Sequence, residues 1–238
     1  MSRTVLITGA SRGIGRSVAE HCLAEGHRLC LGLRDPEAVK GTLLDNAHVL
    51  PVAYDASQPE QAASLVDAAS SWAGGVDALI HCAGILHRTP LLFEDGQEAE
   101  LEELWQVNVM GPWWLTRAAW PHLRSCGNGR IQVMVSMSGK RVKGRMAGYP
   151  VSKFGLMALC QSMRNEGFDH GIRVTAICPS WVNTAMALSV SSVPAQSMTQ
   201  PRDLACLMGR LLELPDAAVP VEIAVNCALE ACARAVRG

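Results

Sequence analysis

The stretch "TVLITGASRGIGRSVAEHCLAEG", residues 4–26, decides the fold class of this chain. A short apolar run leads into a turn with three glycines, Gly9, Gly13 and Gly15, and a helical pattern follows. Such glycines allow a tight turn and let backbone N–H groups at a helix N-terminus approach a pyrophosphate. The spacing is GxxxGxG and differs from the general GxGxxG motif. We interpret it as a nucleotide-binding turn, and the alternative is an ordinary strand-to-helix turn.

The strand-then-helix pattern of this stretch continues along the chain. Apolar runs cover residues 4–8, 28–33, 48–54, 76–82, 130–136, 172–178 and 221–227. Candidate helices cover residues 13–26, 58–73, 98–126 (with a break at Gly111-Pro112), 150–168 and 201–213. Runs that are apolar throughout suit strands buried on both faces of a parallel sheet. The alternation predicts an α/β class with a doubly wound, Rossmann-type fold: a seven-stranded, mostly parallel sheet with helices on both faces. We expect residues 1–238 to form a single domain.

Composition points to a small-molecule partner. The net charge of −1 and the 18% of charged residues give no overall attraction to nucleic acid or an anionic membrane. The nine cysteines include no CxxC pair, and the seven histidines show no metal-ligand spacing, so we expect no metal site and a reducing, cytoplasmic setting. The early first strand predicts that there is no signal peptide, and no apolar stretch reaches the length of a membrane span.

Four more motifs follow the glycine turn in chain order. They are "HCAG" (81–84), "WQVNVMG" (105–111), "SMSG" with "YPVSK" (136–139 and 149–153) and "CPSWVNT" (178–184). Together with "TGASRGIG" (8–15) they resemble the motifs of the short-chain dehydrogenase/reductase family along most of the chain. The resemblance implies a nicotinamide cofactor and a catalytic set of Asn108, Ser136, Tyr149 and Lys153.

Two details of the resemblance need comment. Ser136 rather than Ser138 has the family's spacing, three residues before a glycine and thirteen before the tyrosine. His81 and Cys82 replace both asparagines of the family's NNAG element, and Ser180 replaces a glycine. These replacements put local hydrogen bonding in doubt rather than the chemistry.

The spacing of Tyr149 and Lys153 suggests an acid/base pair. A free phenol has a pKa of about 10, and a nearby cation lowers that pKa. Positions i and i+4 share a helix face, although Pro150 disfavours helical geometry at Tyr149. In the family, the tyrosine exchanges a proton with the substrate oxygen and the serine hydrogen-bonds that oxygen. Lys153 would then lower the tyrosine pKa and hold the nicotinamide ribose, while Asn108 anchors a water.

The residues after the second strand favour NADP as the cofactor. Leu33 occupies the position where the family places the acid of NAD-dependent members, and Arg34 follows it. Arg34 and Arg12 suit a 2′-phosphate, whereas Asp35 would favour NAD if the register slipped. The expected cofactor contacts are Gly9, Ser11, Arg12, Gly13, Ile14, Gly15, Arg34, Asp55, Ala56, Cys82, Ala83, Gly84, Tyr149, Lys153, Pro179, Val182 and Thr184.

The leading hypothesis is an NADP(H)-dependent oxidoreductase that reversibly reduces a ketone or aldehyde, with 3-oxoacyl thioesters among the substrates considered. The alternatives are a non-catalytic NADPH sensor and an NAD-dependent alcohol dehydrogenase. The substrate site should include Ser138, Trp181 and Met186, with residues 187–200 as a flexible lid. The basic run "KRVKGR" (140–145) either attracts an anionic substrate or is a solvated loop. Four tryptophans in residues 105–120 either pack in the core or support a homodimer or homotetramer.

Overall fold

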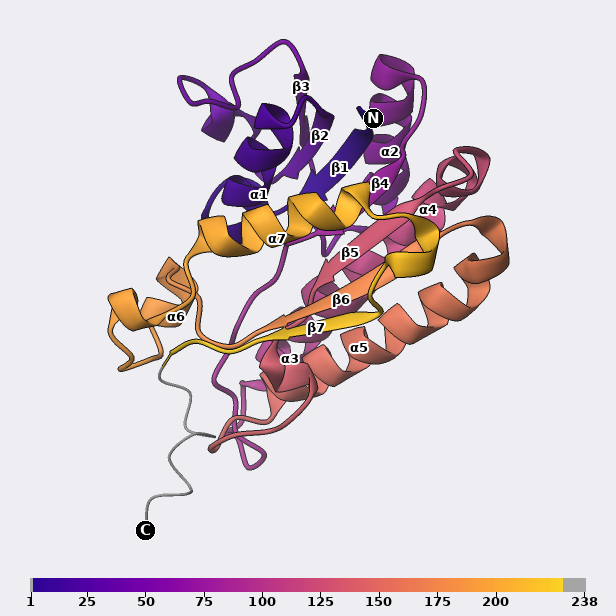
Figure 1. The fold of residues 1–238 in the computed structure, drawn as a ribbon. Helices are drawn as coiled ribbons and strands as arrows, with labels where there is room; N and C mark the ends of the chain where they lie inside the picture. Colours follow the sequence, from indigo (N-terminus) through magenta and orange to yellow (C-terminus); the bar gives the residue numbers. More distant parts are fainter. Residues whose placement is uncertain (1, 229–238) are drawn as a thin grey trace.

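Seven parallel strands form one sheet at the centre of residues 2–228, the part of the chain that this computed structural model describes (Figure 1). The strands lie in the order β3-β2-β1-β4-β5-β6-β7. Their bounds are β1 Thr4–Thr8, β2 Arg28–Leu33, β3 Val49–Ala53, β4 Ala78–His81, β5 Arg130–Met134, β6 Arg173–Pro179 and β7 Glu222–Val225. The prediction of a doubly wound α/β fold is confirmed, and the sheet is parallel throughout rather than mostly so.

Helices cover both faces of the sheet because successive strand residues point to opposite faces. In β1, Leu6 packs in a core with α2, α4 and α5, while Val5 and Ile7 pack in a second core with α1 and α7. All three side chains are fully buried, which explains the uninterrupted apolar run. The α-helices are α1 Gly13–Ala24, α2 Pro59–Ala73, α3 Glu98–Trp105, α4 Gly111–Ser125, α5 Gly148–Gly167, α6 Ala185–Leu188 and α7 Pro201–Glu213.

The expected break at Gly111-Pro112 is wrong. The chain stays helical from Glu98 to Ser125, and the irregularity is a π-helical turn, Gln106–Met110, that precedes Gly111. Pro112 follows this π-helical turn directly, where the regular i→i−4 hydrogen-bond pattern is already interrupted, so its missing N–H does not break the helix. Gly111 is required for packing, since a Cβ there would lie 2.6 Å from the carbonyl oxygen of Ala56.

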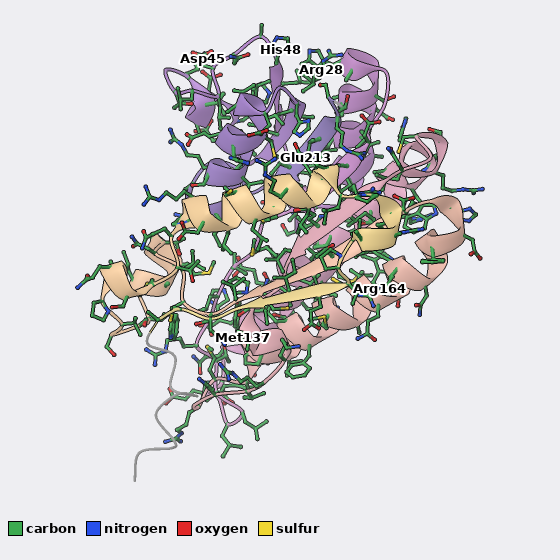
Figure 2. The ribbon with its side chains drawn as sticks, in the orientation of Figure 1. Arg28, Asp45, His48, Met137, Arg164 and Glu213 are labelled. Carbon is green, nitrogen blue, oxygen red and sulfur yellow. The ribbon has the colours of Figure 1, made fainter. Side chains whose placement is uncertain are left out.

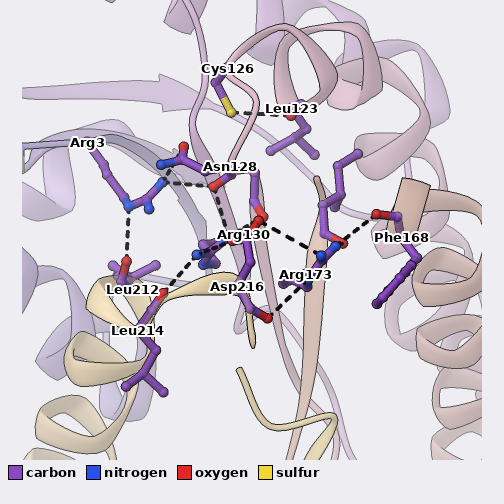
Figure 3. A network of polar contacts seen from close by, with 12 residues as sticks. Arg3, Leu123, Cys126, Asn128, Arg130, Phe168, Arg173, Leu212, Leu214 and Asp216 are labelled. Atoms are coloured by element: carbon purple, nitrogen blue, oxygen red, sulfur yellow. Dashed lines mark hydrogen bonds and ion pairs between the residues drawn. The ribbon is translucent and has the colours of Figure 1, made fainter. Parts of the chain in front are cut away.

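Three arginines fix the amino end of the sheet to the last turn of α7 and the segment after it (Figure 3). Arg3 donates to the carbonyl oxygen of Leu212 at 3.1 Å, and Arg130 donates to that of Leu214 at 2.8 Å. Arg130 and Arg173 also pair with Asp216, at 2.7 and 3.9 Å. The cationic groups at this end are therefore used to hold the protein's own backbone.

The carboxyl ends of the strands lie at the opposite end of the sheet. In Figure 2, Met137, which follows β5, lies far from Arg28 and His48 at the amino ends of β2 and β3. β1 and β4 are neighbours at the centre of the sheet. From β1 the chain continues to β2 and β3 on one side, and from β4 it continues to β5, β6 and β7 on the other, so the strand order reverses between β1 and β4. Ligands of such sheets bind in the crevice at this switch point, beyond the carboxyl ends.

Candidate active site

The glycine turn after β1 packs directly against the loop after β4. A Cβ on Gly9, whose φ is +72°, would lie 2.6 Å from the backbone nitrogen of Ala83. A Cβ on Gly15 would lie 2.3 Å from the carbonyl oxygen of Gly9. The N-cap residue of α1, Arg12, forms no side-chain capping hydrogen bond. The first N–H groups of α1 therefore remain available to an anion, which the helix dipole also favours.

A cavity of about 670 Å³ opens at these turns and extends along the carboxyl ends of the strands. All residues expected to contact the cofactor line it, and so do the three expected substrate residues, Ser138, Trp181 and Met186. Of the catalytic set, Ser136, Tyr149 and Lys153 line the cavity, whereas Asn108 does not. The structure thus brings together almost every site residue that the sequence predicted.

Ser136 has a backbone conformation that only glycine adopts easily. Its φ of 155° makes it the one non-glycine residue with positive φ in the described part of the chain, and its ψ is 159°. Such a conformation costs roughly 1–3 kcal/mol and is found mainly at functional sites. The Ser136 hydroxyl oxygen accepts the N–H of Ser138 at 3.0 Å and is also hydrogen-bonded to the side chain of Tyr149. The structure therefore joins Ser136, and not Ser138, to the tyrosine.

Burial determines the protonation of Tyr149 and Lys153. Desolvation raises the pKa of Tyr149 to about 12, and the hydrogen bond with Ser136 only partly offsets this shift. Desolvation also lowers the pKa of Lys153 to about 8. The Lys153 Nζ lies 5.7 Å from the centre of the tyrosine ring and donates to the carbonyl oxygen of Met134 at 3.0 Å. The expected lowering of the tyrosine pKa by Lys153 is not what the protein without ligand shows, because desolvation dominates.

Asn108 lies in the π-helical turn behind the cavity and is fully buried. Its Nδ2 donates to the carbonyl oxygen of Ile85 at 3.1 Å and to the Ser152 hydroxyl at 3.0 Å. Its Oδ1 accepts the N–H of Ile85 at 2.9 Å. Ser152 in turn donates to the carbonyl oxygen of Tyr149 at 2.8 Å. The asparagine side chain therefore joins the segment after β4 to the first turn of α5, which carries the tyrosine.

Two arginines line the glycine-turn end of the cavity. Arg12 and Arg34 are exposed side chains that line it. Asp35 does not line it, and its carboxylate accepts the N–H of Glu37 at 3.0 Å as the cap of a 3₁₀ turn. Asp55 lines the cavity and accepts two hydrogen bonds from Ser57, at 2.8 and 2.9 Å. The Asp35 carboxylate is thus engaged in a local turn outside the cavity lining.

Two departures from the family motif have local structural explanations. His81 is 3% exposed, and its Nε2 lies 3.0 Å from the hydroxyl of Thr116 in α4. Burial lowers the pKa of His81 to about 4, so the ring is neutral near pH 7. Cys82 lines the cavity, and burial raises the pKa of its thiol to about 12, which leaves it unreactive as a nucleophile. Neither residue disturbs the cavity.

The basic run divides into two parts. Arg141, Lys143 and Arg145 line the cavity, whereas Lys140 pairs with Glu222 of β7 and does not. Sequence reasoning missed two further charged lining residues, Arg88 and Glu103. Arg88 lies only four residues beyond Gly84, which would have placed it near the cavity, while Glu103 is one of several acids on α3 and carried no distinguishing signal.

Part of the expected lid is anchored. Residues 187–200 contain the end of α6 and a 3₁₀ turn, Ala195–Ser197. Near its end, the N–H of Thr199 donates to the carbonyl oxygen of Trp181 at 3.1 Å, and Met198 is buried. Ala187 and Val190 line the cavity. The segment thus lines the cavity near its start and is attached to the fold near its C-terminal end.

Neither a membrane-spanning helix nor a metal-binding cluster is found among the described residues. No helix within residues 2–228 is both long and apolar enough to cross a membrane. Within the same range, no three histidine, cysteine, aspartate or glutamate side chains are grouped so that they could hold a metal ion.

The most informative similarities are to reductases and dehydrogenases. The chain is 33% identical over 231 residues to agropine synthesis reductase of Rhizobium rhizogenes, covering 96% of this chain but 53% of that protein. It therefore spans about half the length of this relative. Two solved structures cover nearly the whole chain. An alcohol dehydrogenase from the archaeon Thermococcus sibiricus, complexed with 5-hydroxy-NADP, superposes with a TM-score of 0.86 at 25% identity, covering 96% of this chain and 97% of that one.

The second is the 3-ketoacyl-(acyl-carrier-protein) reductase of Brucella melitensis complexed with NADH, with a TM-score of 0.84, 27% identity and coverage of 94% of this chain and 96% of that one. The profile of the family described as short chain dehydrogenase matches residues 3–194, most of the chain. That match, together with the parallel sheet and the motif residues gathered in one cavity, shows that the chain belongs to the short chain dehydrogenase family.

Proposed function

We propose that this chain is an NADP(H)-dependent oxidoreductase that reduces a ketone or aldehyde to an alcohol, reversibly. The observation that carries the proposal is the shared cavity of Ser136, Tyr149 and Lys153 with the glycine turn and the uncapped N-terminus of α1. Since strands of the same sheet come from residues as far apart as Thr4 and Val225, we also propose that residues 1–238 form a single cofactor-binding domain.

Tyr149 would act as the general acid in the direction of reduction. With its pKa raised to about 12, the phenol is protonated near pH 7 and can donate to the carbonyl oxygen. Ser136 would hold the same oxygen and stabilise the negative charge that develops on it. The bound nicotinamide supplies the hydride. Lys153 remains mostly protonated at pH 7 despite its lowered pKa and would hold the ribose hydroxyls.

Asn108 would act by positioning. Its side chain has used both amide hydrogens on Ile85 and Ser152, so it fixes the start of α5 on which Tyr149 lies. The π-helical turn around it alters the regular backbone hydrogen-bond pattern, as such turns often do at functional sites. We propose that a backbone group of this turn, rather than the Asn108 side chain, holds the water of the proton relay.

NADP is the cofactor that the charged residues favour. Arg12 and Arg34 line the cavity where a 2′-phosphate would lie, and Asp35 is engaged in capping. Charge-assisted hydrogen bonds to phosphate are the stronger class, at roughly 1.5–3 kcal/mol each. Of the two similar structures, one was solved with an NADP derivative and the other with NADH, so the proposal of NADP rests on these two arginines.

The function is tested with stereospecifically deuterated NADPH and a panel of ketones, aldehydes and 3-oxoacyl thioesters. We expect deuterium in the alcohol product and a kcat/KM for NADPH at least about tenfold above that for NADH, as expected for one charge-assisted contact. NADPH binding without turnover of any carbonyl would support the alternative of a sensor. A preference for NADH would support an NAD-dependent alcohol dehydrogenase instead.

Self-association is a further part of the proposal. Trp105 and Trp113 are 42% and 48% exposed, and Val151 and Phe154 of α5 are also exposed. Trp114 and Trp120 instead pack against the core, so the four tryptophans divide between the two roles expected of them. We propose that the exposed apolar residues of α3, α4 and α5 join copies in a homodimer or homotetramer. Analytical ultracentrifugation of the wild type and of Phe154→Glu would test this, with a monomeric wild type refuting it.

A further inference from the structure

The charged side chains of the cavity are distributed unevenly. Within the described part of the chain, seven cationic and two anionic residues line it, although the whole chain has a net charge of −1. The cations are Arg12, Arg34, Arg88, Arg141, Lys143, Arg145 and Lys153, and the anions are Asp55 and Glu103. Arg12, Arg34 and Asp55 lie at the glycine-turn end, and Lys153 belongs to the catalytic set. Arg88, Arg141, Lys143 and Arg145 remain, and among residues 2–228 Glu103 is the one acid that lines the cavity beside them.

These four cations come from two segments that the backbone ties together. The loop that carries Arg141, Lys143 and Arg145 connects Ser136 to Tyr149, so it begins and ends at catalytic side chains. Its far end is fixed because the N–H groups of Ala147 and Gly148 donate to the carbonyl oxygen of Thr89 at 2.9 and 3.2 Å. Arg88 is the residue before Thr89, which places it beside the same loop.

The one acid at this end is already engaged. Glu103 Oε2 lies 2.7 Å from Nε2 of His87 in a contact between the segment after β4 and α3. Among the described residues, four cationic and one acidic side chain line this end of the cavity, and a concave site of predominantly one charge sign concentrates ligands of the opposite sign. A neutral steroid-like or alkyl ketone has no anionic group that could pair with these cations.

We propose that the substrate is a carbonyl compound that carries an anionic oxygen group, a carboxylate or a phosphate, bound by Arg88, Arg141, Lys143 and Arg145. This inference rests on the proposed reductase function and adds the substrate class. The anionic group would lie toward the 141–145 loop while the carbonyl lies against Ser136 and Tyr149. Specificity thus resides in the loop between the two catalytic side chains.

The test compares matched pairs that differ only in the anionic group. The carboxylate probes are straight-chain 2-oxo and 3-oxo acids against their methyl esters, and the phosphate probe is dihydroxyacetone phosphate against dihydroxyacetone. We expect kcat/KM with NADPH to be at least about tenfold higher for the anionic member of the preferred pair. It should fall as salt rises from 20 to 300 mM, because exposed charges are screened beyond about 8 Å at physiological ionic strength. The neutral member should show a flat salt response.

Substitutions show which residues cause the preference for the anionic substrate. Two variants are tested: the single variant Arg145→Gln, and the triple variant with Arg141→Gln, Lys143→Gln and Arg145→Gln. Each should lose most of the preference for the anionic member of the pair. For the neutral member, kcat/KM should stay within about twofold of the wild type, which also shows that the variants fold. Lys140→Gln is the matched control, since Lys140 belongs to the same run but pairs with Glu222 outside the cavity. It should leave both substrates unaffected.

The outcomes separate this inference from the proposed function. A preference within the phosphate pair alone would support the inference with phosphate as the anion, and one within the acid–ester pairs would support it with carboxylate. Equal rates and equal salt curves for both members of every pair would overturn the inference while leaving the reductase function in place. Turnover of no carbonyl compound at all would overturn both.

Discussion

His81 should make the folded protein sensitive to acid. The ring is 3% exposed, and the nearest polar partner is the hydroxyl of Thr116 at 3.0 Å. Burial lowers its pKa from 6.5 to about 4, because no acidic group compensates the desolvation of the imidazolium. In the unfolded chain the ring titrates at its ordinary value. The unfolded state therefore binds more protons than the folded state between about pH 6.5 and 4.

The sign and size of the effect follow from this difference. A base with a depressed pKa contributes stability that is present above its unfolded pKa and lost as the pH falls through its folded pKa. With a folded pKa of about 4, the loss from this one residue is about 2 kcal/mol between pH 7 and 5 and about 3 kcal/mol between pH 7 and 4. His27 also has a lowered pKa, through partial burial, and adds a smaller loss in the same direction.

The assay compares urea unfolding of the wild type and His81→Asn at pH 7, 6, 5 and 4. Asparagine keeps a polar group at the end of β4 but cannot be protonated, so the variant should lose about 3 kcal/mol less than the wild type over this range. The difference between the two curves cancels the contribution of His27. As a second readout, NMR titration of the histidine Cε1 protons should show one ring that is still neutral at pH 5 in the wild type and missing in the variant.

Parallel stability curves for the two proteins would refute the reasoning. They would mean that the buried ring titrates near its ordinary pKa, through water entry or a rearrangement around Thr116. An NMR pKa of about 6 for His81 would lead to the same conclusion independently of the unfolding model. A variant that is less stable at pH 7 but has the flatter curve would still support the prediction.

Four further predictions concern the cavity. Tyr149→Phe should reduce kcat by at least about 10²-fold, the usual contribution of a general acid, yet bind NADPH normally in a fluorescence titration. Ser136→Ala should lose far more activity than Ser138→Ala, and the reverse ranking in a rate assay would reassign the serine. Arg34→Ala should weaken NADPH by about one to two orders of magnitude in Kd and leave NADH nearly unchanged, whereas equal losses would refute a phosphate contact. Gly9→Ala should lower the free energy of unfolding by at least about 1–3 kcal/mol, because its φ of +72° and the nearby backbone both oppose a Cβ; an unchanged urea midpoint would contradict this.

Much of the fold could be predicted because burial on both faces leaves a plain signal. The run at residues 4–8 matches β1, Thr4–Thr8, and the helix expected at 201–213 matches α7, Pro201–Glu213. The π-helical turn at Gln106–Met110 gave no such signal, since its residues are compatible with an ordinary helix. The break was expected at the following Gly-Pro pair for that reason.

The sequence was sufficient to predict which residues form the site, but not their pKa shifts or their ion pairs. Spacing identified Tyr149 and Lys153, and the cavity unites them. Spacing cannot reveal how thoroughly each is desolvated, so the direction of the tyrosine pKa shift was missed. Likewise, the sequence shows six consecutive residues with four basic side chains, but the fold is needed to show that Lys140 pairs with Glu222 while Arg141, Lys143 and Arg145 line the cavity.

The arginines at the two ends of the sheet have consequences for protein engineering. At the amino end, Arg3, Arg130 and Arg173 bond to backbone carbonyls of Leu212, Leu214 and Phe168, so the sheet is fixed to the last turn of α7 and to the segments that follow α7 and α5, far from the cavity. At the carboxyl end, the cations other than Lys153 lie outside the helices and strands and form no part of that network. Residues 141–146, which follow the Lys140–Glu222 ion pair, can therefore be exchanged as a unit. Transplanting it between members of the family should transfer substrate charge preference, while the thermal stability of the recipient remains that of its own sheet.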